Sequence, residues 1–197
     1  MSFRFDIHIR KQSCRQWLLG LLCLGLAGGG AFSAEKGAVV SEYEVKAALV
    51  YNFTKFTEWP SNAFLAADAP TLVGILGDDA FGKLLGDVLA GESVAGHPLQ
   101  VRRLTGEDAL PACQVLFISK SEKERLKTIL ATVRDLPVLT ISETEGFGQL
   151  GGMVNFVVVD KSIRFEINPG AAQHAGIKIS SKLLNLPKAI KVETRKE

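Results

Sequence analysis

Three glycines in the second half of the chain offer the first candidate for chemistry. Gly146, Gly148 and Gly151 match the G-x-G-x-x-G spacing of a dinucleotide-binding loop. That spacing holds a pyrophosphate only when a helix begins directly after the glycines, because the free amides and the dipole of the helix N-terminus face the anion. Here the next element is an apolar run of strand type, residues 153–159. We therefore interpret the segment as a glycine-rich loop that leads into a strand, and we predict no cofactor.

Nucleophiles and metal ligands are equally sparse. Residues 91–96 come close to a nucleophile elbow but have one residue too many before the second glycine. Cys113 opens an apolar run, which predicts a buried and inert thiol. His97 and His174 each stand without further ligands at metal spacing, so we predict surface histidines and no metal site. The lack of a catalytic set favours binding and regulation, and we predict that the protein is not an enzyme.

One small polar group remains. Arg164 and Glu166 are two residues apart on a predicted strand, so their side chains lie on the same face. They could pair with each other, or they could form the floor of a ligand or partner site together with His174 of the following helix. The final segment of the chain is rich in Lys and Arg, which indicates either a solvated helix face or proximity to anionic lipid or an acidic partner.

The first residues of the chain differ in composition from the rest. Basic side chains up to Arg15 precede an apolar run, residues 17–27, and small residues follow at 31–34. This order is typical of a secretory signal peptide, and the run of about 11 residues is too short for a bilayer, which needs about 20. We predict a signal peptide over residues 1–34, cleaved near Ala31 to Ala34, and an exported domain over residues 35–197.

Removal of this segment changes the composition of the 197-residue chain. The formal charge falls from +2 to −1, so we predict no nucleic acid partner. Cys14 and Cys23 leave with the signal, and Cys113 alone cannot form an internal disulfide. The remaining domain is long enough to bury a sufficient core without such a link.

Apolar runs that alternate with helical patterns indicate the elements that position these residues. A capping box at Ser41 and Glu44 predicts a helix over residues 41–58 that is apolar on two faces, and a second box at Ser121 and Glu124 predicts a helix to Val133. Asp79 is the expected cap of a helix over residues 80–89. Strands are predicted at residues 71–76, 99–104, 114–118 and 138–141.

The pattern changes after these elements. Residues 153–159 and 163–167 predict an antiparallel hairpin, and Asn168 with Pro169 predicts the start of a final helix. The tail after Pro187 is charged and is expected to be frayed. We therefore predict an α/β fold, a single domain with a mixed sheet, helices on both faces and a C-terminal β-hairpin plus helix. The expected inner face of the final helix is Ala172, Ala175, Ile179, Leu183 and Leu186.

The sequence also resembles the YfiR family over nearly the whole exported domain. Its most specific motif is residues 51–60, which read Tyr-Asn-Phe-Thr-Lys-Phe-Thr-Glu-Trp-Pro. Further similar segments follow in the same order: 113–119, 139–142, 146–151, 163–168 and 175–184.

This resemblance implies a non-catalytic periplasmic protein with an α/β sandwich that is often dimeric. In the best-known system of the family, such a protein binds the periplasmic part of an inner-membrane diguanylate cyclase and holds it inactive. An outer-membrane lipoprotein with a peptidoglycan-binding domain sequesters the repressor, after which cyclic di-GMP rises and favours biofilm. The best-known branch carries cysteine pairs, and this chain has only Cys113, so redox control by an internal disulfide is not expected.

We therefore predict a homodimeric negative regulator in cyclic di-GMP signalling that binds a membrane diguanylate cyclase or another membrane sensor. The alternative is a periplasmic small-molecule-binding or sensing module for another receptor or transporter, with a pocket near Trp59, Arg164 and His174. The residues predicted to contact a partner or ligand are Tyr43, Tyr51, Trp59, Arg164, Glu166, His174, Lys178 and Lys182.

Overall fold

A computed structural model describes residues 41–66, 68–78 and 81–195 of the chain. The predicted signal peptide and the predicted cap at Asp79 lie outside these residues. The described residues belong to one compact unit. Its first helix, α1, runs over Glu42–Lys55 and begins at the predicted capping box, because the Ser41 side chain accepts from the Glu44 amide and the Glu44 side chain accepts from the Ser41 amide.

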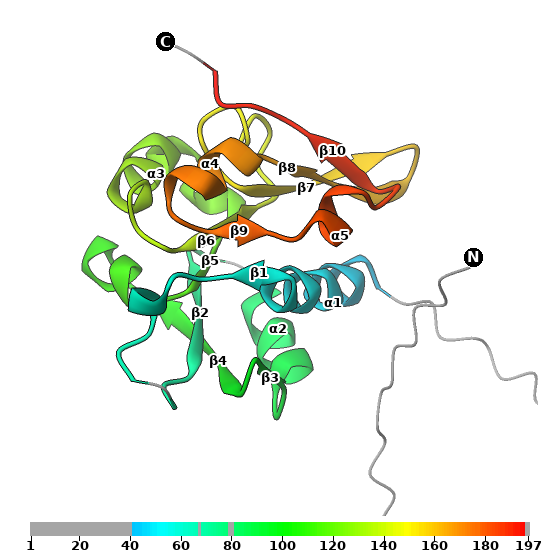
Figure 1. The fold of residues 1–197 in the computed structure, drawn as a ribbon. Coiled ribbons are helices and arrows are strands. Elements are labelled where there is room, and N and C mark those ends of the chain that lie inside the picture. The colour runs from blue at the N-terminus through cyan, green and yellow to red at the C-terminus, as the bar shows by residue number, and fades with distance from the viewer. Residues whose placement is uncertain (1–40, 67, 79–80, 196–197) are drawn as a thin grey trace, which may run out of the picture. The chain divides into compact units, whose positions relative to one another are not determined.

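A mixed eight-stranded sheet forms the centre of the described part of the chain (Figure 1). Its strand order is β10-β8-β7-β6-β5-β2-β4-β3, and the run from β4 through β2, β5 and β6 to β7 is parallel. The mixed sheet predicted from the sequence is thus confirmed. The strands are β2 Thr71–Leu76, β3 Ser93–Val94, β4 His97–Leu104, β5 Val115–Ile118, β6 Leu139–Ser142, β7 Val154–Val159, β8 Ser162–Ile167 and β10 Ala189–Lys191.

Helices cover both faces of this sheet, as predicted. Along β5, Val115 and Phe117 belong to one buried cluster and Leu116 and Ile118 to another, since successive side chains of a strand point to opposite faces. The first cluster includes residues of α1 and α2, and the second includes residues of α3. The remaining helices are α2 Phe81–Leu89, η1 Ser61–Ala63, η2 Glu107–Ala112, η3 Lys120–Arg125, α3 Leu126–Val133, α4 Pro169–His174 and α5 Ser181–Leu184.

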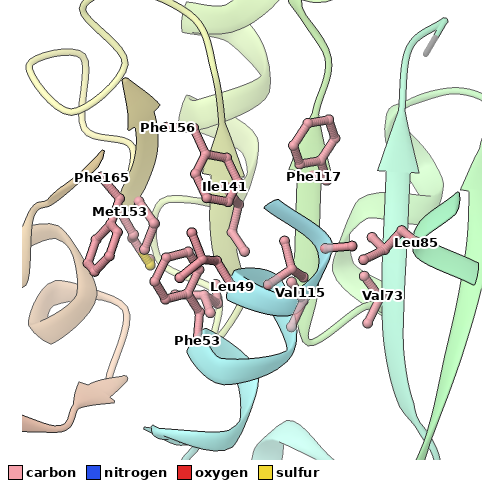
Figure 2. Packing of buried hydrophobic residues seen from close by; sticks show 14 of the residues in the cluster. Leu49, Phe53, Val73, Leu85, Val115, Phe117, Ile141, Met153, Phe156 and Phe165 are labelled. Atoms are coloured by element: carbon pink, nitrogen blue, oxygen red, sulfur yellow. The ribbon is translucent and has the colours of Figure 1, made fainter. Parts of the chain in front are cut away.

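Aromatic packing joins α1 to the hairpin of β7 and β8. Figure 2 shows the fully buried Phe53 of α1 beside Met153, Phe156 and Phe165. The Phe53 ring lies 4.9 Å from the Phe165 ring in an edge-to-face arrangement and 5.8 Å from the Phe156 ring. The hairpin itself turns at Asp160 and Lys161, both with positive φ, as a two-residue turn of type I′ requires. The predicted hairpin is confirmed.

The end of α1 differs from the prediction. The helix ends at Lys55 rather than continuing to Glu58, because Thr57–Glu58 forms a short strand, β1, that pairs with β9, Lys178–Ile179. The amide of Ser180 also donates to the carbonyl of Phe56. Pairing with this distant segment therefore replaces the last predicted turn of the helix.

The start of the helix that includes α3 differs too. Ser119, rather than Ser121, caps this segment, and its first residues form η3 instead of an α-helical turn. The Ser121 hydroxyl accepts from the amide of Asp78, 2.9 Å away, after the end of β2. Its predicted capping role is therefore wrong, because this side chain holds a neighbouring loop.

The predicted final helix is broken into three parts, α4, β9 and α5. Asn168 and Pro169 begin α4 as predicted, but Gly176 has a φ of +72°, a conformation that ends the helix. Ala172, Ala175 and Leu183 are nevertheless buried. The tail predicted to be frayed instead forms β10, which pairs in parallel with β8 and covers its edge.

Candidate functional site

A buried asparagine joins three segments next to the hairpin. Asn168 is 1% exposed, and its Oδ1 accepts from the amide of Ala171, which caps α4. Its Nδ2 donates to the carbonyl of Gly148 and to the hydroxyl of Thr194, each at 2.9 Å. This one side chain therefore fixes the glycine-rich loop, α4 and the C-terminal segment relative to one another.

The C-terminal segment is also held directly on the glycine-rich loop. The amide of Arg195 donates to the carbonyl of Gln149 at 2.9 Å. A Cβ at Gly148 would lie only 2.6 Å from Cγ2 of Val192, so a side chain at this position would push the segment away. Gly148 is thus required for close approach, and not for binding a phosphate.

These contacts form the walls of a groove of about 1860 Å³. Residues of α3, the glycine-rich loop, α4 and the C-terminal segment line it. Four Lys or Arg side chains and His174 are set against three Glu side chains among the lining residues, which makes the groove mildly basic. These titratable residues are Lys127, Arg134, Lys191, Arg195, His174, Glu145, Glu166 and Glu193.

The structure brings two of the predicted site residues, Glu166 and His174, to this groove. Glu166 does not form the expected pair with Arg164. Its Oε2 accepts instead from Nδ2 of Asn155, its cross-strand neighbour on β7, at 3.1 Å. His174 lies 2.6 Å from Asp135 and is half exposed. Among the described residues Arg164 makes no ion pair, and it is not part of the groove lining.

The predicted aromatic contacts of the N-terminal segment lie elsewhere. Tyr43 is 44% exposed on α1 and its ring packs against Phe81. Burial, together with nearby Glu92, raises the pKa of Tyr51, which packs at the margin of the core. Trp59 donates its indole N–H to the carbonyl of Gln114 at 3.2 Å. Trp59 thus links the segment after α1 to the start of β5, and it does not line the groove.

The predicted lysines are also outside the groove. Lys178 lies on β9, opposite Glu58 of β1, and Lys182 lies in the first turn of α5. Both side chains are exposed. Of the three residues expected to line a pocket, Trp59, Arg164 and His174, only His174 lines the groove.

A buried ion pair is the main polar feature that the sequence analysis missed. Lys46 of α1 is 4% exposed, and its Nζ lies 2.5 Å from Glu143 and 2.6 Å from Glu42. Burial disfavours the ammonium form, but the hydrogen bonds that Lys46 donates to both carboxylates outweigh this effect and hold the pKa of Lys46 above its ordinary value. The sequence signal for this buried ion pair was Lys46 itself, a lysine within an apolar face of the predicted helix.

Cys113 and His97 complete the comparison with the sequence predictions. Cys113 is 2% exposed, and burial raises the pKa of its thiol to about 12, which confirms the predicted inert thiol. His97 is partly buried and stacks on Phe64 with its ring centroid 4.1 Å away.

Over residues 41–66, 68–78 and 81–195, no helix combines the length and the apolar character needed to cross a bilayer. Over the same ranges, no three His, Cys, Asp or Glu side chains gather closely enough to hold a metal ion.

Comparison with known proteins adds one finding. A family model described as YfiR/HmsC-like matches residues 43–188, which include all but the first residue of α1, the sheet through the hairpin, and α4. No curated protein matches the chain.

Proposed function

Because the chain belongs to the YfiR/HmsC-like family, we propose that it binds the periplasmic part of an inner-membrane diguanylate cyclase and holds that enzyme inactive. The family comprises periplasmic regulators of diguanylate cyclase systems, which are generally not catalytic. The single observation that carries the proposal is the family match over residues 43–188. The identity of the cyclase as the direct partner, and the inhibitory direction, are the proposed parts.

The basic groove is the proposed contact surface. Asn168 and the Gly148 contact hold three of its four wall segments in place, namely the glycine-rich loop, α4 and the C-terminal segment, so this part of the surface is preorganised and loses little freedom on binding. Lys127, Arg134 and Lys191 provide positive charge that would attract an acidic partner surface. Glu166 and His174 lie within the same groove, which keeps two of the residues predicted from the sequence in the proposed contact.

Inhibition by this route is a population shift. A regulator silences a membrane enzyme only if it binds the inactive arrangement more tightly than the active one. A shift from 1:99 to 99:1 needs a ratio of about 10⁴ in affinity. Contact through the groove would provide such a ratio only if the inactive cyclase presents an acidic segment that its active arrangement removes.

Cellular cyclic di-GMP tests the proposal. Deletion of the gene should raise the nucleotide level, and the wild-type gene should restore it. Arg134→Glu with Lys191→Glu should fail to restore it, because both reversals place negative charge in the groove. The control is Lys178→Glu, which reverses an exposed charge outside the groove and should restore the wild-type level.

Two outcomes would contradict the proposal in different ways. An unchanged nucleotide level after deletion, with no membrane cyclase recovered in a pulldown, would refute the cyclase as the partner. In the second outcome, Lys178→Glu alone fails to restore the nucleotide level, while the groove variants restore it and all variants are equally stable. That result would show that the contact lies on the surface that includes β9.

A further inference from the structure

A second hollow, of about 250 Å³, lies where β6 ends beside the hairpin. β6 pairs with β7 only through Ile141 with Val154 and Ser142 with Asn155. β7 continues to Val159 beyond this register, so among the described residues its last part has no strand neighbour on this side. The hollow occupies this position, and its polar lining comes from Glu42, Lys46, Lys120, Glu143, Glu145 and Glu166.

The charges of this lining do not balance. Lys46 is held between Glu42 and Glu143, and Nζ of Lys120 lies 3.5 Å from the other oxygen of Glu143. Both lysines are therefore engaged with these two carboxylates. Glu145 and Glu166 form no ion pair with any described residue, so the hollow carries two carboxylates without a cation.

Asn155, whose buried amide oxygen has no donor in the described part of the chain, forms part of the same lining. Asn155 is 2% exposed and its Nδ2 donates to Glu166, while its Oδ1 has no hydrogen-bond partner among the described residues. If the amide oxygen and nitrogen of Asn155 were exchanged, the oxygen would face Oε2 of Glu166 and two acceptors would meet. The atom without a partner is therefore the carbonyl oxygen of the Asn155 side chain. Such an atom is costly to bury and calls for an N–H or O–H donor.

We propose that this hollow binds a small organic cation that carries ammonium groups on a short aliphatic chain. The ammonium groups would pair with Glu145 and Glu166 and donate to Oδ1 of Asn155, and the chain would lie against Phe156 and Val158. A single metal ion fits less well, because no three acidic or His side chains of the described residues converge on one point. Glu145, Gly146 and Glu166 line both this hollow and the groove, so the binding test has to separate the two places.

The test uses 1,4-diaminobutane as the probe, with the protein purified from the periplasm. 1,4-Butanediol and NaCl at matched ionic strength serve as the neutral and ionic controls. The diamine should raise the melting temperature in a saturable manner, whereas the controls should not, because a ligand that binds only the folded state stabilises it. Backbone amide NMR shifts should centre on Phe156 to Val158, and not on Ala171 of the groove.

Single charge removals test the geometry. Glu145→Gln and Glu166→Gln should each weaken diamine binding by about tenfold or more, since each removes a charge-assisted hydrogen bond. Glu145 is exposed, so its variant stays informative even if Glu166→Gln unfolds. Glu124→Gln, an exposed residue outside the hollow, is the matched control and should bind as the wild type does. Equal shifts with the diol or NaCl, equal loss in Glu124→Gln, or a response to CaCl₂ alone would each overturn the proposal.

Discussion

Replacement of Asn168 by Ala should destabilise the protein and release its C-terminal segment. The substitution removes the cap of α4, worth about 0.5–2 kcal/mol, and two buried hydrogen bonds worth about 1 kcal/mol each. It also leaves the buried carbonyl of Gly148 without the donor that it has now. We therefore expect the free energy of unfolding to fall by about 3 kcal/mol.

Two measurements check this prediction. Urea denaturation gives the free energy of unfolding, and native-state hydrogen exchange reports local opening, which should become faster at the amides of Val192 and Arg195. The control is Asn185→Ala, an exposed residue after α5, which should change stability by no more than about 0.5 kcal/mol. A loss below about 1 kcal/mol for Asn168→Ala, or unchanged exchange at both amides, would show that the side chain does not hold these segments together.

Three further predictions concern buried groups, and denaturation measures each one. Lys46→Met should cost about 3 kcal/mol at pH 7, because it leaves the buried Glu143 without its close cation, and adding Glu143→Gln should recover most of that loss. Cys113 has a folded pKa of about 12 against 9.0 for a free thiol, so the contribution of its protonated thiol to stability is complete below pH 9 and is lost as the pH rises towards 12. Cys113→Ala should remove this pH dependence of the free energy of unfolding. An identical dependence in the variant would contradict the prediction. Gly148→Ala should destabilise by about 1–3 kcal/mol through the clash with Val192, and a second change, Val192→Ala, should relieve the clash; no relief would contradict the packing argument.

Local signals in the sequence were sufficient for much of the fold. The capping box of Ser41 and Glu44 forms as predicted, because both partners lie within one helical turn. The hairpin is confirmed because Asp160 and Lys161 fit a two-residue turn between two apolar runs. The parallel strands follow from their continuous apolar character and their alternation with helices.

One error arose at a glycine inside a predicted helix, and two arose where a distant segment decides the local structure. The apolar spacing of residues 172–186 resembles one helix, but Gly176 ends it, and the same side chains reach the core from shorter elements. Thr57 is in a strand because Ile179 is its partner, and Ala189 is in a strand because β8 has an open edge. No local pattern contains these partners.

The polar sites show the same limit. Glu166 and His174 were candidates because they are polar residues on predicted elements. The pair of Lys46 and Glu143 joins residues 97 positions apart, so no spacing rule could find it. Asn155, as a single amide within an apolar strand, was the one visible sign of the second hollow.

The pairing of β1 with β9 also has a kinetic consequence. It brings Thr57 into register with Ile179 across about 120 residues of intervening chain, a contact of high sequence separation that forms late and slowly. Until β9 arrives, the segment after α1 has no strand partner. We therefore expect the domain to complete its folding only once its C-terminal part is available, so that a chain truncated before Lys178 would remain an open intermediate.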